Sequence, residues 1–273
     1  FPGHMTKTRR LIEADLKMVD AVVEITDARI PESSRNPILD ELVKDKPRII
    51  LMNKCDYADE AATRAWKQYY EKKGIRVLTC DCRSGKGLNA FLPEVKRLLA
   101  ELIERRKKRG MIGKALRLMV VGIPNVGKSS FINRMAKTKK TKVGDKPGVT
   151  RGKQWVSIDK DVELLDMPGI LWPKFDDQLA AQRLAFTGAI KDDVMDTEAL
   201  ARALGAVLKE QYPELLNARY KLTGDEDILR DIAKSRGMLV SGGEPDTERA
   251  AAALLDEYRG GKIGRITLEK PGR

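Results

Sequence analysis

The sequence holds few of the residues that form disulfide frameworks or metal centres. Three cysteines and one histidine occur among its 273 residues. Cys55, Cys80 and Cys82 do not follow the spacing of a zinc site, and a single histidine nearly excludes a mixed His/Cys site. We therefore expect free thiols in a reducing compartment.

Long apolar runs are missing as well. No run approaches the ~20 apolar residues that a membrane-spanning helix needs. The first ten residues, FPGHMTKTRR, lack the apolar centre of a secretory signal peptide. Because the first residue is Phe rather than Met, we expect a few residues to precede it. These absences predict a cytoplasmic protein that does not bind a membrane, and nothing in the sequence predicts an oligomer.

Acidic residues are too few to balance the basic ones. The chain has 52 Lys and Arg residues against 40 Asp and Glu residues, which gives a net charge of +12. Residues 177–273 hold 15 basic and 17 acidic residues, so the positive excess lies within residues 1–176. It is concentrated in two clusters, at 105–117 and 134–153. One cluster alone would indicate a solvated helix end or loop, but two favour binding to a polyanion.

Strand and helix patterns alternate along the first 176 residues. Buried strands are predicted at 19–26, 48–52, 75–80, 116–121, 155–158 and 162–165. Helices are predicted at 6–18, 37–44, 58–73, 129–136 and, as one long amphipathic helix, 88–109. This alternation predicts an α/β fold with a mostly parallel sheet and helices on both faces.

After residue 176 the pattern becomes helical. Helices are predicted at 178–187, 196–210, 226–236 and 246–258. We therefore expect two domains, an α/β domain of residues 1–176 and a small all-helical domain of residues 177–273. The glycine-rich, basic residues 258–273, YRGGKIGRITLEKPGR, predict a loose tail or a short hairpin with a strand at 263–268.

Residues 122–129, GIPNVGKS, match a phosphate-binding pattern between a predicted strand and a predicted helix. Glycines let successive backbone N–H groups turn toward phosphates, and the helix start adds its positive dipole end. Lys128 is expected to reach the β- and γ-phosphates, and the Ser129 hydroxyl to ligate Mg²⁺. The nucleotide-binding residues expected here are Asn125, Val126, Gly127, Lys128, Ser129 and Ser130.

Two further segments are expected to serve the γ-phosphate. In residues 166–169, DMPG, Asp166 would hold Mg²⁺ through water and the Gly169 N–H would meet the γ-phosphate. Thr150 would complete the Mg²⁺ shell from a switch loop that is ordered by the triphosphate, with Thr138 and Thr141 as alternatives. The candidate catalytic residues of these motifs are Lys128, Thr150 and Gly169.

A base-selecting motif lies earlier in the chain, at residues 53–56 (NKCD). The Asp56 carboxylate can accept from N1–H and N2–H₂ of guanine, whereas adenine offers no donors on that edge. Asn53 would brace the loop, and Lys54 would pack its stem over the base. A second base loop is expected at residues 81–87, DCRSGKG. Candidate base-site residues are Asn53, Lys54, Cys55, Asp56, Cys82 and Arg83.

The order of these motifs is a cyclic shift of the usual one. In an ordinary GTPase the phosphate loop opens the domain and the base selector follows, whereas here the base selector comes first. Joining the old termini and opening the chain elsewhere preserves the sheet when the termini lie close together at the surface. We therefore expect a circularly permuted P-loop GTPase domain followed by the helical domain.

The sequence resembles the circularly permuted ribosome-biogenesis GTPases of the RbgA (YlqF) type. The similar motifs are FPGHM at 1–5, DARIPESSRNP at 27–37, NKCD, GIPNVGKSS, KPGVTR at 146–151 and DMPGILWPK at 166–174. The resemblance implies a bacterial, cytoplasmic, Mg²⁺-dependent GTPase that binds GTP and GDP and acts in late maturation of the large ribosomal subunit. It also implies that the helical domain contacts ribosomal RNA. Similar proteins usually carry Ser where this chain has Cys82 and Arg83; backbone N–H groups are expected to make the contact there.

The position that orients water in Ras-like GTPases is Gln, and here it is Ile170, which cannot hydrogen-bond to water. We therefore expect slow intrinsic hydrolysis that the bound ribosomal particle stimulates. Asn125 is a candidate ligand for a K⁺ ion that supplies positive charge. His4 is a candidate for orienting water. From the residues alone, a disordered terminus or a cloning remnant is the favoured explanation of His4, whereas the resemblance implies a functional histidine there.

Two other classes of function are open at this point. A phosphotransferase acting on a small molecule would share the phosphate loop but would leave the NKCD motif unexplained. A nucleotide-regulated RNA-binding module would bind without turnover. Turnover with GTP against ATP, with and without ribosomal subunits, separates these hypotheses.

Overall fold

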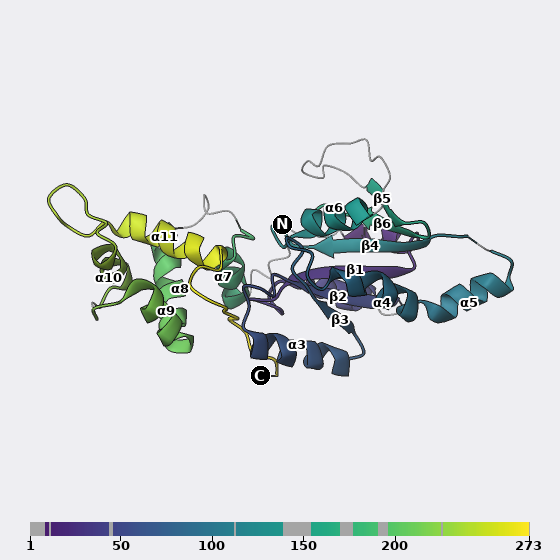
Figure 1. The fold of residues 1–273 in the computed structure, drawn as a ribbon, viewed down its shortest axis with the longest axis horizontal. Helices are drawn as coiled ribbons and strands as arrows, with labels where there is room; N and C mark the ends of the chain where they lie inside the picture. The colour runs from purple at the N-terminus through teal and green to yellow at the C-terminus, as the bar shows by residue number, and fades with distance from the viewer. Residues whose placement is uncertain are drawn as a thin grey trace.

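The computed structural model describes residues 9–10, 12–43, 46–111, 113–138, 154–169, 177–190, 196–224 and 226–272. Its centre is a six-stranded sheet of order β3-β2-β1-β4-β6-β5 (Figure 1). The strands are β1 (Ala21–Asp27), β2 (Arg48–Asn53), β3 (Arg76–Thr79), β4 (Leu116–Gly122), β5 (Gln154–Asp159) and β6 (Val162–Asp166). All neighbouring strands are parallel except β5 and β6. The predicted mostly parallel sheet is confirmed.

Helices cover both faces of the sheet because its strands are apolar on both sides. Val23 of β1 packs on one face with Phe131, and Val22 packs on the other with Leu39. Trp66 and Tyr70 close that second face over β2. The helices in these layers are α2 (Pro37–Leu42), α3 (Glu60–Lys72), α4 (Phe91–Leu98) and α6 (Lys128–Thr138).

The single long helix predicted at 88–109 is wrong. A 3₁₀ turn, η1 (Leu88–Ala90), precedes α4, and Leu99 then separates α4 from α5 (Ala100–Lys108), with φ −101° and ψ 16°. Apolar spacing continues across Leu99, so periodicity alone does not reveal the break. None of the residues of α5 is buried, and this helix extends beyond the sheet (Figure 1).

The region after the sheet is helical, as predicted. Asp196, Asp227 and Asp246 each cap a helix by accepting from a backbone N–H of its first turn. The helices are α7 (Gln178–Phe186), α8 (Thr197–Gln211), α9 (Pro213–Tyr220), α10 (Ile228–Ser235) and α11 (Thr247–Arg259). The sequence patterns missed α9, which begins at a proline in its first position. Within the described residues, none of the helices has an apolar stretch long enough to cross a lipid bilayer.

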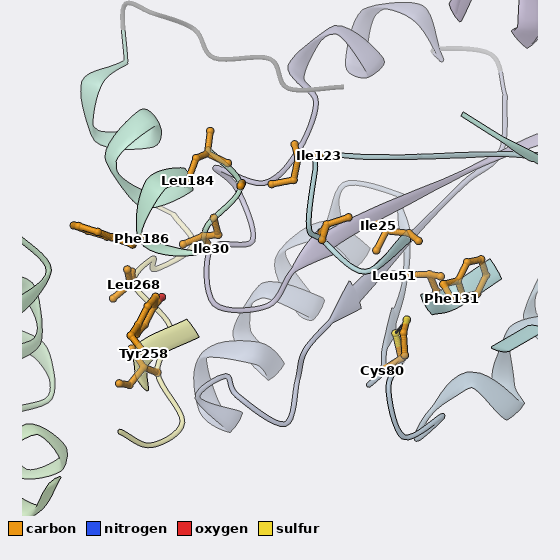
Figure 2. Packing of buried hydrophobic residues seen from close by; sticks show 14 of the residues in the cluster. Ile25, Ile30, Leu51, Cys80, Ile123, Phe131, Leu184, Phe186, Tyr258 and Leu268 are labelled. Atoms are coloured by element: carbon orange, nitrogen blue, oxygen red, sulfur yellow. Dashed lines mark hydrogen bonds between the residues drawn. The ribbon is translucent and has the colours of Figure 1, made fainter. Parts of the chain in front are cut away.

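One apolar core connects the sheet to the helical region. Figure 2 shows Ile25 and Phe131 in the same cluster as Leu184, Phe186 and Tyr258. Buried apolar area is the main source of stability, so the two regions stabilise each other. The domain boundary at residue 176 remains a prediction.

The prediction of a loose C-terminal tail is wrong. Residues 262–269, which we call the strap, run from the end of α11 back to α3 (Figure 1). Ile263, Ile266 and Leu268 are at most 5% exposed. The Leu268 N–H donates to the Arg29 carbonyl (2.8 Å), and Trp66 Nε1 donates to the Glu269 carbonyl (3.0 Å). The strap forms no strand ladder because its partners belong to different loops.

Candidate nucleotide-binding site

The centre of the sheet provides a binding crevice. β1 and β4 are neighbours, with β2 and β3 lying beyond β1 and β6 and β5 beyond β4. Loops that leave the carboxyl ends of β1 and β4 therefore diverge, and ligands of open α/β sheets bind at such a point. The predicted phosphate loop follows β4, and the NKCD segment follows β2.

A cavity of about 590 Å³ lies at this edge of the sheet. Its lining combines residues of the phosphate loop with residues of the DMPG segment, although 38 residues separate Lys128 from Asp166. The lining residues are Ile123, Pro124, Asn125, Gly127, Lys128, Ser129, Ser130, Pro168 and Gly169. The cavity therefore contains the expected anion-binding backbone, the Ser129 hydroxyl and Gly169.

Gly127 is required by the local geometry. It has φ +101°, and a Cβ atom there would lie 2.2 Å from Asn53 Nδ2. Helix α6 begins at the next residue, Lys128, so its free N–H groups and positive dipole end face the cavity. These features fit a bound phosphate chain.

Lys128 and Asp166 form a buried ion pair between Nζ and Oδ1, with each side chain 8% exposed. Their mutual neutralisation offsets the cost of burying each charge. Asp166 ends β6 beside β4, in register with Val120. The expected phosphate-binding ammonium and the expected Mg²⁺-binding carboxylate thus lie together beneath the phosphate loop.

Asn53 joins three segments of the site. It ends β2 and is 3% exposed. Its Nδ2 donates to the Val126 carbonyl of the phosphate loop (2.7 Å), and its Oδ1 accepts from the Cys82 N–H of the second base loop (2.9 Å). The amide therefore fixes the distance between the base loops and the phosphate loop.

Lys54 reaches back to the phosphate loop. Its Nζ donates to the Asn125 carbonyl (2.9 Å) and lies 3.1 Å from Asp27 Oδ2. Asp27 also receives two side-chain hydrogen bonds from Arg29, at 2.9 and 2.8 Å. Burial alone would raise the pKa of Asp27, but Arg29 and Lys54 hold it well below the ordinary value. Asp27 is therefore ionised at neutral pH.

Asp56 lies partly exposed beyond Lys54. Burial, and next the Asp81 carboxylate, raise its pKa above the ordinary value. Asp81 itself accepts from the N–H groups of Arg83 (2.8 Å) and Ser84 (3.1 Å), which shape the second base loop. A purine that offers donors to Asp56 would therefore favour its ionised form.

The three cysteines are free thiols, as predicted; Cys55 and Cys82 belong to the base loops, and Cys80 directly precedes the second one. The Cys80 and Cys82 sulfurs are 3.7 Å apart and buried. The Cys82 contact and burial raise the pKa of Cys80, and burial raises the pKa of Cys55. The Cys80 thiol therefore packs as a small apolar group, since its thiolate is disfavoured there. Cys82 serves the site through its backbone N–H, by bracing Asn53.

Some predicted residues are not placed. His4, Thr141, Thr150 and Ile170 lie outside the described residues, as does the side chain of Thr138. Asn125 is described: its Nδ2 donates to the Gly188 carbonyl (2.7 Å), which links the phosphate loop to the turn after α7.

Asp27 and Arg29 were missed as site residues. A signal for Asp27 is present in the sequence, because it ends an apolar strand just as Asn53 ends the next one. Asp27 and Asn53 are register partners across the parallel pair β1 and β2. Polar residues that end adjacent parallel strands gather at one edge of the sheet.

Comparison with known proteins identifies relatives over nearly the whole chain. A family model described as "50S ribosome-binding GTPase" matches residues 117–218. Ribosome biogenesis GTPase A of Bacillus licheniformis is 48% identical, over 99% of this chain and 97% of its own. Mitochondrial ribosome-associated GTPase 1 of Mus musculus is 33% identical, over 99% of this chain and 89% of its own.

The fold also matches a solved structure of YlqF from T. maritima bound to GNP. The TM-score is 0.65 at 30% identity, and the match covers 97% of this chain and 98% of the other. The matches to both of these relatives extend over 99% of this chain, so they span its NKCD segment and its phosphate loop. The chain therefore belongs to the ribosome biogenesis GTPase A family and is a GTPase of YlqF-like fold.

Proposed function

We propose that this GTPase acts late in maturation of the bacterial large ribosomal subunit, in the cytoplasm, by binding a subunit precursor and its rRNA. The observation that carries the proposal is the double contact of Asn53, which fastens a guanine-type base loop to a phosphate loop in a chain 48% identical to a ribosome biogenesis GTPase. The small-molecule phosphotransferase leaves that base loop without a role. We further propose the GTPase domain at residues 1–176 and the RNA-contacting domain at residues 177–273.

We assign the roles of the site residues as follows. Asp56 accepts from the guanine edge, Lys54 covers the ring, and the backbone of residues 125–130 holds the phosphates. Lys128 contacts the β- and γ-phosphates, and the Gly169 N–H contacts the γ-phosphate. Ser129, Thr150 and, through water, Asp166 would hold Mg²⁺, since hydroxyl and carboxylate oxygens are the hard donors that it prefers. When bound there, Mg²⁺ would supply positive charge beside the transferred phosphoryl group.

Hydrolysis requires a group that positions the attacking water. Ile170 cannot hydrogen-bond to water, so another residue must do this. We propose His4 for this role, and we propose that binding of the ribosomal particle completes the catalytic arrangement. The side-chain oxygen of Asn125 suits a K⁺ ion, since its amide nitrogen is already occupied by Gly188. Intrinsic turnover would then be slow and particle-stimulated turnover fast.

His4→Ala is expected to lower particle-stimulated GTP turnover by about 10²-fold, the lower range for loss of a group that transfers or orients protons. GDP affinity should not change, because His4 would act on water and not on the nucleotide. Phosphate release with and without isolated large subunits measures the effect, in K⁺ and again in Na⁺. Full stimulated turnover in the variant would remove His4 from the mechanism.

A basic surface at the end of α5, in the proposed GTPase domain, is a second candidate for RNA contact besides the helical domain. Arg105, Lys107, Lys108, Arg109 and Lys114 are all exposed, and in the described part of the chain none of them is in an ion pair. Nearby, the Arg117 guanidinium lies over the Trp155 ring at 4.9 Å. Exposed, unpaired cations release counterions when they bind phosphates, which favours a nucleic-acid partner.

Simultaneous replacement of Lys107, Lys108 and Arg109 by Ala is expected to weaken binding to large subunits. The logarithm of the binding constant for subunits decreases linearly with the logarithm of the salt concentration. The steepness of this decrease should be reduced by about 3, one for each lost phosphate contact. Binding to subunits is measured by co-sedimentation at several salt concentrations. The control replaces three exposed cations in and just after α3, Arg64, Lys72 and Lys73, and equal loss in both variants would contradict a specific surface on α5.

A further inference from the structure

The strap contacts the base loop directly. Arg265 Nη2 donates to the Cys55 carbonyl (3.2 Å) and its Nε to the Asp56 carbonyl (3.3 Å). The Ile266 N–H donates to the Tyr57 carbonyl (2.9 Å). Three successive carbonyls of the base loop, including that of Asp56, are thus hydrogen-bonded by two adjacent residues of the strap.

The strap also binds the segment after β1. The Thr267 hydroxyl donates to the Ala28 carbonyl (3.1 Å) and accepts from the Asp59 N–H (3.1 Å). Arg29, whose carbonyl accepts from the Leu268 N–H, directs its guanidinium to the carbonyls of Tyr258 and Arg259 at the end of α11 (3.3 and 3.2 Å). The strap and α11 therefore hold the same two loops that Asp27 and Lys54 join.

Gly261 sets how closely the strap approaches. It has φ +69°, and a Cβ atom there would lie 2.5 Å from Cδ1 of the Tyr57 ring. Real Cβ atoms do not approach a ring carbon so closely, so a side chain at 261 must move Tyr57 or the strap. Gly237 offers a matched comparison: it has φ +63°, and a Cβ there meets no described atom within 4 Å.

We propose that the strap is the outer support of the guanine-reading loop and that Arg265 is a positioning residue for Asp56. The inner side of this loop is fixed by Asn53 and Lys54, whose bonds reach the phosphate loop. The outer side of the loop is held by the strap, through the bonds from Arg265 to the Cys55 and Asp56 carbonyls. Because hydrogen bonds at the Cys55 and Asp56 carbonyls restrict the backbone of the loop, they restrict where the Asp56 carboxylate can lie. The inference rests on the proposed role of Asp56.

The arrangement couples the helical region to the base. If a docked strap raises guanine affinity, guanine must stabilise the docked strap by the same factor, since binding free energies are reciprocal. A partner that moves α11 would therefore change nucleotide affinity through the base loop, without acting on the γ-phosphate.

Two pairs of variants test this proposal: Gly261→Ala against Gly237→Ala, and Arg265→Ala against the exposed Arg249→Ala of α11. G261A and R265A should each weaken GDP binding about 3- to 10-fold, the value of one or two net hydrogen bonds. Their preference for GDP over inosine diphosphate, which lacks the 2-amino group, should shrink. Pyrophosphate, which has no base, should bind as it does to the unaltered protein. Both controls should keep the original GDP affinity and preference.

Asp56→Ala in the same titrations separates the two claims. If D56A binds GDP normally, the assignment of the base site fails. If D56A weakens GDP binding while G261A and R265A keep the original GDP affinity and the original preference over inosine diphosphate, the strap proposal is overturned. Should G261A not fold, R265A still decides, since the Arg265 side chain is 50% exposed. Hydrogen exchange gives an independent measurement: GDP should slow exchange of the Ile266 and Leu268 amides, and unchanged rates would contradict the coupling.

Discussion

Replacing Asp56 with Asn is expected to exchange the base that this GTPase prefers. The amide would place an N–H₂ group against the N–H donors of guanine, whereas the 2-oxo group of xanthine would accept from it. A site built around such donors and acceptors discriminates by roughly 10⁴, so the preference for GDP over xanthosine diphosphate should fall by about that factor. Fluorescence titration with labelled forms of both nucleotides measures it.

Asp59→Asn is the matched control for this substitution. Asp59 lies three positions further on and caps α3 by accepting from the Ala62 N–H (2.8 Å), a role that Asn fills equally well. Its base preference should not change. If D56N retained the original preference for GDP, Asp56 would not read the base and the proposed site would be wrong.

The pH dependence of GDP binding follows from the raised pKa of Asp56. Guanine requires the carboxylate, so affinity is complete above this pKa and declines as the pH falls through it. Because burial and Asp81 raise the pKa of Asp56, the decline in affinity should begin at a higher pH than the ordinary Asp pKa of about 4 would give. The same titrations repeated at falling pH measure the decline, and D56N should not show it.

Asp27→Ala is expected to lower the free energy of unfolding by about 3 to 5 kcal/mol, the cost of leaving a buried charge without its partner. The side chains of Asp27 and Arg29 are 2% and 1% exposed, so water cannot replace the lost bonds. Urea denaturation measures the loss. The control, Glu60→Ala, breaks ion pairs with Arg64 and Arg265 in which every side chain is at least half exposed, and it should cost at most about 1 kcal/mol.

Two further measurements test the origin of that loss. The pKa of Asp27 is lowered in the folded state. Its contribution to the free energy of unfolding is therefore complete above the ordinary Asp pKa, and it is lost as the pH falls toward the lower pKa of the folded state. The difference between the D27A variant and the unaltered protein should therefore narrow below about pH 4. Adding Arg29→Met should recover part of the loss, since it removes the unpaired charge. A difference that persists in strong acid would indicate lost packing instead.

The sheet and the motif residues could be predicted because their signals are local. A run such as 116–121 is apolar throughout, and GIPNVGKS follows it directly, so one short window contains both the strand and its loop. NKCD stands in the same relation to β2. Parallel pairing then brings the two segments together without further information, as the contact of Asn53 with Val126 shows.

The strap could not be predicted because its reasons are not local. Residues 263–268 give only a short strand signal, and glycines with basic residues around them suggest a loose tail or a hairpin. The burial of the strap depends on loops roughly 200 positions earlier, such as Tyr57 and Ala28. The break at Leu99 escaped for a related reason, since apolar spacing is unchanged where the helix leaves the sheet.

The contact between Arg265 and Cys55 spans 210 positions of the polypeptide. Synthesis proceeds from the amino terminus, and early segments begin to fold while later ones are still being added. The pocket for the purine therefore emerges first on a translating ribosome but gains its outer wall only when residues 262–269 have been made. A nascent chain would hold guanine nucleotides weakly, and full selectivity would mark a chain whose helical region has been completed.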